Sequence, residues 1–478
     1  MEDHRRSSHL TRRALLQGAG GAVVAAILPT RLGMAAESVV SPVMATLATY
    51  MSEAQGRALA RDVIEKAKHH ILDTFAAMIS GAELAPGRAA IQFARAYGGE
   101  KVATVAASNV VCGPIEAALA NGVLAHSDET DDSWPSGWHP GCNVVPAALA
   151  AGERFGVTGM HFVRAVTLGY DIGSRVLITL RPGVFDTHKS THSIGGTFGA
   201  AAAAGCAANL NAQQMRWLID YTAQQSSGVA AWDRDSDHIE KGFVFGGMPA
   251  RNGVTSALLV HAGWTGVDDI LSGDDNFLLA NAPHGDANAL IAKLGERYEI
   301  TRTSIKKWTV GSPIQAPLDA LEILLKRHSF GPDQVRDVVV RMIPGSVVDN
   351  REMPDICIQH MLAVMLVDKT VTFRSAHDKP RMKDPAILRQ RAKVRLNPGA
   401  GQPLVAVVLA DGTRFSEDVA AVLGTENNPM SREQVVAKAR DLMTPVLGAS
   451  AGAKLIEKTL DLENVKSIRE LRPLLQRS

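Results

Sequence analysis

Apolar side chains recur every three or four residues along most of the segment 43–266. This spacing places them on one face of an α-helix. The longest such run, residues 53–80, includes Leu59 and Phe75 at that spacing. Further helices are predicted at residues 115–125, 144–155, 161–176, 195–210 and 248–262.

The pattern changes near residue 301, where short apolar runs typical of strands begin to alternate with helices. Strands are predicted at residues 335–343, 392–396, 403–409 and 414–416. The last two are joined through Asp411-Gly412, a dipeptide typical of tight turns. Helices are predicted at residues 318–327, 358–366, 431–447 and 452–460.

These elements predict a mainly α protein in which a smaller α/β domain is inserted into a larger all-helical domain. The expected bounds are 43–300 for the helical domain, 301–424 for the α/β domain, and 425–478 for C-terminal helices that return to the helical domain.

The N-terminus has the pattern of an export signal rather than of a folded element. A basic start containing Arg12-Arg13 precedes an apolar stretch, residues 14–28, and small residues follow at 33–36. We therefore expect residues 1–36 to be a twin-arginine signal peptide that directs the protein to the periplasm through the twin-arginine translocation machinery. The alternative is a disordered or amphipathic N-terminal segment.

Composition excludes several classes of function. The net charge is +1 and charged residues make up 21% of the chain, so no overall field favours nucleic acid or a membrane surface. The four cysteines lie far apart without a C-x-x-C pair, which indicates buried free thiols rather than zinc or thioredoxin chemistry. Phosphate-binding, serine-hydrolase and H-E-x-x-H motifs are absent, and we expect no metal site.

The densest chemistry follows the apolar helix at 115–125. Residues 126–134 contain four acids and His126, and His139-Pro140-Gly141 comes shortly afterwards. Carboxylates near a histidine orient the imidazole and set its proton affinity, which is the arrangement of a general acid or base. A helix end with capping aspartates is the alternative interpretation.

Three further segments carry polar residues into apolar, glycine-rich surroundings. Residues 185–199 hold His188 and His192 ahead of a small-residue helix. Lys241 precedes another helix start, and Lys306 lies near the predicted domain junction. Clefts between domains are common ligand sites, although surface histidines and a snorkelling lysine are the alternatives.

Taken in order, these four segments resemble the 2-methylcitrate dehydratase family (MmgE/PrpD), which includes cis-aconitate decarboxylase and iminodisuccinate epimerase. The family pattern H-x-x-D-F-D-D-T…H-P-[SA] is similar to residues 126–140, and G-x-F-G-A-A-A-A is similar to residues 196–203. The family lysine before a glycine-rich helix start corresponds to Lys241, and I-K-[KR]-[FWY] corresponds to residues 305–308.

The resemblance implies a homodimer whose helical domain carries an α/β lid, with a site between the domains that uses no metal or organic cofactor. It implies small di- or tricarboxylate substrates. The implied catalytic residues are His139, His192, Glu129, Asp131 and Lys241. The implied substrate-binding residues are Ser133, Lys306, His188, Arg251 and Lys307.

The sequence departs from the family pattern at two places. Glu129 replaces an aspartate and Thr130 a phenylalanine, and the family's second histidine falls on Ser190. A local shift lets either His188 or His192 take its place, and we favour His192.

The expected activity is a lyase that dehydrates or decarboxylates a small polycarboxylate by general acid–base catalysis. An epimerase or isomerase of a similar acid is the second hypothesis. An exported protein that binds carboxylates for a transporter is the third.

Overall fold

The computed structural model describes residues 40–135, 137–181, 184–342, 348–399 and 404–477. The predicted signal peptide at 1–36 lies outside these residues and stays a prediction. Within the described ranges, no helix combines the length and apolarity that crossing a membrane requires.

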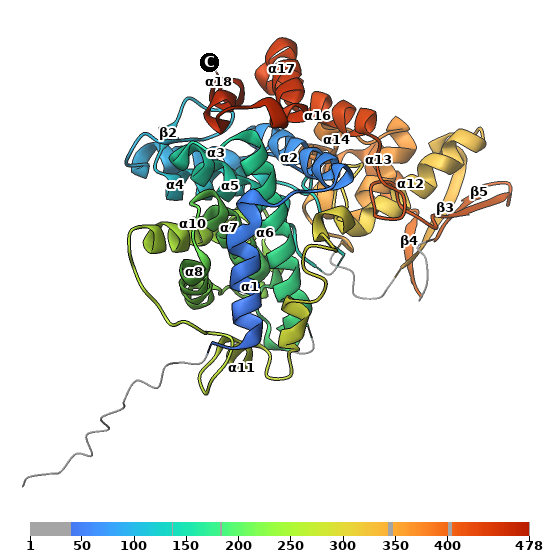
Figure 1. The fold of residues 1–478 in the computed structure, drawn as a ribbon. Helices are drawn as coiled ribbons and strands as arrows, with labels where there is room; N and C mark the ends of the chain where they lie inside the picture. Colours follow the sequence, from blue (N-terminus) through green and yellow to red (C-terminus); the bar gives the residue numbers. More distant parts are fainter. Residues whose placement is uncertain (1–39, 136, 182–183, 343–347, 400–403, 478) are drawn as a thin grey trace, which may run out of the picture. The chain divides into compact units, whose positions relative to one another are not determined.

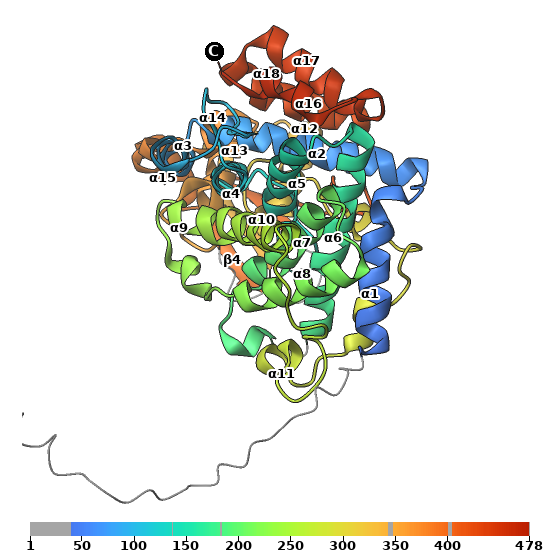
Figure 2. The same cartoon turned by 60° about the vertical axis from the view of Figure 1, so that its left-hand side comes forward.

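Most helices pack around a larger hydrophobic core, built from residues 44–305 and 430–475. They are α1 (Pro42–Glu53), α2 (Arg61–Gly81), α3 (Ala85–Tyr97), α4 (Pro114–Ala125), α5 (Gly141–Phe155), α6 (Gly159–Leu180), α7 (Thr191–Ala207), α8 (Ala212–Gln225), α10 (Met248–His261), α11 (Phe277–Asn281), α16 (Arg432–Leu447), α17 (Ala449–Leu460) and α18 (Arg472–Leu475). The C-terminal helices return to this core, because α16 and α17 pack against α2 (Figures 1 and 2).

Small side chains let the helices around α7 approach closely. The alanine run 200–204 is buried, and α7 packs against α5, α6 and α10. Gly122 in α4 faces Gly246, and a Cβ added at Gly246 would lie 2.0 Å from the Gly122 carbonyl oxygen. Only glycine fits this contact, which sets the distance between α4 and the segment that carries Phe245.

A smaller core is formed by residues 308–419. Its helices are α12 (Ser312–Arg327), α13 (Ile358–Asp368), α14 (Phe373–Ala376) and α15 (Pro385–Arg391). Its strands are β3 (Val335–Met342), β4 (Val394–Pro398), β5 (Leu404–Leu409) and β6 (Arg414–Asp418), in the spatial order β4-β3-β5-β6. Only the β3–β4 pair is parallel. A separate two-stranded sheet pairs β1 (Ala103–Thr104) with β2 (Val111–Cys112).

The inner strands of the four-stranded sheet bury alternate valines. Val338 lies opposite Val407 and Val340 opposite Val405, and all four are fully buried. Helices α12 and α13 contact this sheet and each other, so the period-two pattern of the valines explains which face of the sheet they cover.

The predicted mainly helical fold with a smaller α/β part is confirmed. The chain leaves the larger core after Ile305 and returns to it at Met430. The predicted domain bounds at 301 and 424 stay predictions.

One predicted element is wrong. The continuous helix at 53–80 is interrupted, because α1 ends at Glu53 and α2 begins at Arg61. The Arg164 side chain takes the backbone carbonyls of Gln55 and Arg57 as acceptors, at 2.9 Å each. These tertiary hydrogen bonds satisfy carbonyl groups that a continuous helix would have used itself.

Candidate active site

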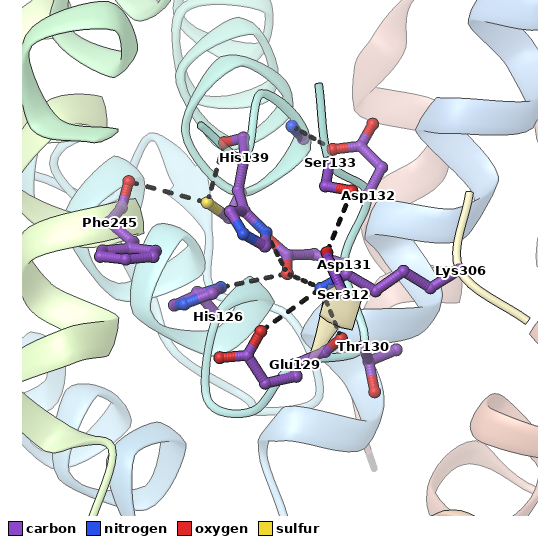
Figure 3. A network of polar contacts seen from close by, with 12 residues as sticks. His126, Glu129, Thr130, Asp131, Asp132, Ser133, His139, Phe245, Lys306 and Ser312 are labelled. Atoms are coloured by element: carbon purple, nitrogen blue, oxygen red, sulfur yellow. Dashed lines mark hydrogen bonds and ion pairs between the residues drawn. The ribbon is translucent and has the colours of Figure 1, made fainter. Parts of the chain in front are cut away.

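The acidic part of the loop between α4 and α5, residues 126–132, is buried rather than solvated. Each of its four carboxylates meets a basic side chain, and Figure 3 shows two of them, Asp131 beside His126 and His139, and Glu129 beside Lys306. The pairs are Asp128 with His377, Glu129 with Lys241 and Lys306, Asp131 with His126 and His139, and Asp132 with His70. A buried carboxylate is costly unless it is paired, so the loop is held by these contacts.

Asp131 orients His139. One carboxylate oxygen of Asp131 lies 3.1 Å from Nδ1 of His139 and 3.1 Å from Nδ1 of His126. With Nδ1 occupied, Nε2 is the nitrogen of His139 that a substrate can use. Burial lowers the pKa of His139 despite the attraction of Asp131, and the charge of Lys306 lowers it further. The imidazole is therefore neutral near pH 7 and able to accept a proton.

Glu129 interacts with two lysines. Lys241 Nζ forms an ion pair with its carboxylate, and Lys306 Nζ donates to its backbone carbonyl at 2.8 Å. Burial opposes ionisation of Glu129, but the charges of Lys241 and Lys306 outweigh it and hold its pKa well below the usual range. Burial works against the charge of Lys306 as well, but Glu129 and Asp131 raise its pKa. Glu129 and Lys306 are therefore charged near neutral pH.

His192, near the start of α7, stacks on Phe245 with 3.7 Å between ring centroids. Its Nδ1 has no hydrogen-bond partner among the described residues. Burial and the neighbouring His139 lower the pKa of His192 well below its usual value. Its ring centroid lies 5.3 Å from that of His139, so two neutral imidazoles are adjacent.

Glu129, His139, His192 and Lys241 border a cavity of about 110 Å³. The larger core contributes Glu129, His139, His192, Trp232, Asp233, Lys241 and Phe245 to its lining. The smaller core contributes Gly311, Ser312 and Pro313 at the start of α12, with Val348, Arg351 and Ile356. The cavity therefore lies between the segments that build the two cores. The lining carries two cations, Lys241 and Arg351, together with two acids, Glu129 and Asp233.

Among the described residues, one cluster offers three possible metal ligands. Ligand atoms of His126, Asp131 and Cys142 lie within 4.8 Å of one another. The Cys142 thiol, however, lies 3.2 Å from the His139 carbonyl oxygen as a donor, and burial raises its pKa well above the usual value. Metals bind the thiolate, so this protonated thiol is a poor ligand. The prediction that no metal is required stays a prediction.

Comparison with known protein families identifies the chain. Residues 45–288 match the profile of the MmgE/PrpD N-terminal domain, and residues 308–463 match that of the MmgE/PrpD C-terminal domain. The chain belongs to the MmgE/PrpD family. Its curated relatives include cis-aconitate decarboxylase of Homo sapiens, which is 24% identical over 444 residues that cover 87% of this chain and 90% of the relative. Cis-aconitate decarboxylase of Aspergillus terreus is 23% identical over 457 residues, covering 87% and 92%.

Membership of the MmgE/PrpD family and these relatives support an enzyme of the dehydratase or decarboxylase type. The two profiles meet in the stretch 289–307, close to the place where the chain passes from the larger to the smaller core.

The cavity brings together four of the residues that the MmgE/PrpD resemblance implied as catalytic: Glu129, His139, His192 and Lys241. Asp131 lies behind His139 and acts on it rather than lining the cavity. Of the two candidates for the second histidine, His192 lines the cavity, whereas His188 is exposed. Ser190 occupies the family's histidine position as the N-cap of α7, accepting from the Ser193 amide.

All five residues expected to bind substrate lie outside the cavity lining. Lys306 is buried beneath Glu129, and Ser133 contacts the cavity-lining Ser312 through hydroxyl oxygens 3.3 Å apart. Direct contact of Arg251 and Lys307 with a ligand in this cavity is not supported. The Arg251 side chain donates to Asn252, and Lys307 pairs with Asp319 and Glu322 on α12.

Sequence reasoning missed the residues that close the site from the other side. These are Trp232, Asp233 and Arg351 on the cavity, and His238, Asp355 and His377 in the buried network around it. The acidic stretch at residues 233–240, just before Lys241, was a usable signal for Trp232, Asp233 and His238. Arg351 and His377 stand in segments without a recognisable pattern.

Proposed function

We propose that the protein is a cofactor-independent lyase that removes water or carbon dioxide from a small di- or tricarboxylate. The observation that carries this proposal is His139, a neutral imidazole fixed by Asp131 on the wall of a cavity whose lining also contains Lys241 and Arg351. Both reactions build negative charge on a carbon next to a carboxylate, which demands a positioned acid or base and fixed cations.

In this mechanism the substrate carboxylate beside the reacting carbon lies near Lys241, and His139 Nε2 faces that carbon. For dehydration, His139 takes the proton from the carbon, and the resulting imidazolium gives a proton to the hydroxyl group, which leaves as water. For decarboxylation, the carbon–carbon bond breaks, carbon dioxide leaves, and a proton from water is delivered to the carbon through His139. Lys306 forms ion pairs with Glu129 and Asp131 outside the cavity lining, so its role is to position these two carboxylates.

The second candidate function is epimerisation of a similar acid. One observation favours it: His139 and His192 are adjacent neutral imidazoles on the same cavity. Removing a proton from one face of a carbon and returning it to the other requires two such groups.

A panel of carboxylic acids separates the candidates. We expect purified protein to produce new alkene absorbance or carbon dioxide from at least one di- or tricarboxylate. A change in optical rotation without either product would favour the epimerase. Saturable binding of an acid without any product would contradict an enzyme and favour an exported carboxylate-binding protein.

Export and assembly are further parts of the proposal. We infer that residues 1–36 direct the folded protein through the twin-arginine route to the periplasm, because Arg12-Arg13 precedes an apolar stretch. Replacing both arginines by lysine should leave the enzyme in the cytoplasm of a bacterial host, and unchanged export of that variant would contradict the signal. The homodimer is proposed from the family resemblance, and light scattering measures it directly.

A further inference from the structure

Arg351 lies on the cavity lining, in the segment between β3 and α13. Its guanidinium donates to the backbone carbonyl of Asp233 at 2.6 Å, and a second nitrogen lies 3.4 Å from the Asp233 carboxylate. Asp233 also lines the cavity and belongs to a short 3-10 helix, Ala230–Arg234, that packs against the larger core. The pair therefore joins segments of the two cores at the cavity.

The contact between the two charged groups is weak. The Asp233 side chain is 48% exposed and meets the guanidinium at one long distance rather than through two parallel hydrogen bonds. A fork of donors binds a carboxylate best when two oxygens are engaged together. Among the described residues, the guanidinium of Arg351 donates to Asp233 alone. Most N–H groups of the guanidinium therefore remain available to a ligand.

Lys241, which also lines the cavity, is paired more closely than Arg351. Lys241 forms its ion pair with the buried carboxylate of Glu129, and its side chain is 10% exposed. Arg351 is 23% exposed. The charge of Lys241 is thus largely compensated, whereas Arg351 is more accessible and more loosely held.

We propose that Arg351 selects for substrates with a second carboxylate, remote from the reacting carbon. This carboxylate displaces the side chain of Asp233 and engages the guanidinium through two oxygens. Asp233 holds Arg351 in place while the cavity is empty and competes with the substrate for it. The inference rests on the proposed function, since it assigns one end of the same substrate.

Binding of three unreactive acids to the full chain tests this selection. Tricarballylate, glutarate and butyrate carry three, two and one carboxylates on the same three-carbon frame. Calorimetry measures the affinity for each acid. We expect Arg351→Gln to lower the affinity for tricarballylate and glutarate by at least about tenfold, and the affinity for butyrate by less than about twofold. Arg351→Lys keeps the charge but loses the fork, so its loss should be intermediate.

Asp233→Asn is the matched test of competition. It should raise the affinity for tricarballylate severalfold when Arg351 is present. In the double variant with Arg351→Gln it should leave that affinity unchanged. Equal weakening of all three acids by Arg351→Gln, or no weakening, would overturn the inference, as would a looser Asp233→Asn complex. Thermal unfolding identifies any variant that fails to fold.

Two outcomes separate this inference from the proposed function. Polycarboxylate binding that depends on Arg351, without turnover of any acid, supports the inference and contradicts the lyase. Turnover of a polycarboxylate with the same KM in wild type and Arg351→Gln supports the lyase and contradicts the inference. A KM raised by Arg351→Gln with a smaller change in kcat supports both.

Discussion

Replacing His139 by alanine is expected to lower kcat by at least about a hundredfold, because it removes the positioned acid or base from the cavity wall. The structure adds a reason for a large effect: both Asp131 and Lys306 act on this imidazole. Turnover of the acid identified in the panel measures the loss.

The matched control for this substitution is His284→Ala. His284 is exposed and does not line the cavity, so its variant should retain wild-type turnover. Both variants should unfold at temperatures close to that of the wild type. A His139→Ala enzyme with wild-type activity would remove His139 from the mechanism.

Raising the pH from 6.5 to 9 is expected to remove about 3 kcal/mol of stability through His377. Burial opposes the charge of His377, but its contact with the Asp128 carboxylate, at 2.9 Å, outweighs burial and raises its pKa to about 9. The difference from the ordinary value of 6.5, at about 1.36 kcal/mol per pKa unit, gives this magnitude. Because the folded pKa is the higher one, the contribution is complete below pH 6.5 and lost as the pH rises through 9.

Chemical denaturation of wild type and His377→Gln across this range checks the effect. The variant should be less stable at pH 6.5 and should approach the wild type near pH 9, because it lacks the ion pair at every pH. Comparing the two proteins cancels the titrating groups that do not interact with His377. Asp355, whose pKa burial raises to about 6, is attracted to His377 and belongs to the effect that the comparison measures. Parallel curves, with the same difference at all pH values, would contradict a charged His377.

The sequence was informative where chemistry is concentrated in short segments. Glu129, Asp131 and His139 stand within one loop, and their mixture of acids with a histidine is unusual for a solvated turn. Lys241 was recognisable because a cation before a glycine-rich helix start has few structural explanations. Periodicity also located the four strands of the smaller core and many of the helices, whereas α1, α3 and α8 were not predicted individually.

The sequence was less informative where a residue acts through a partner far along the chain. Asp128 and His377 are 249 positions apart, since 377 − 128 = 249, and neither local sequence shows the need for the other. Arg351 similarly gains its meaning only when the fold brings it to Asp233. Lys306 and Lys307 are adjacent, yet one is buried under Glu129 and the other pairs on α12. Tertiary packing, rather than the local sequence, therefore determines which of the two lysines lies at the site.

The central claim is that His139 performs acid–base chemistry on a polycarboxylate in this cavity. Proton nuclear magnetic resonance in deuterium oxide tests it most directly, because dehydration, decarboxylation and epimerisation all change the protons next to the carboxylate. We predict that the wild type converts at least one di- or tricarboxylate, with alkene formation or deuterium delivered to carbon, and that His139→Ala does so at about 1% of that rate or less. An unchanged spectrum for every acid, or equal rates for the two proteins, would contradict the claim.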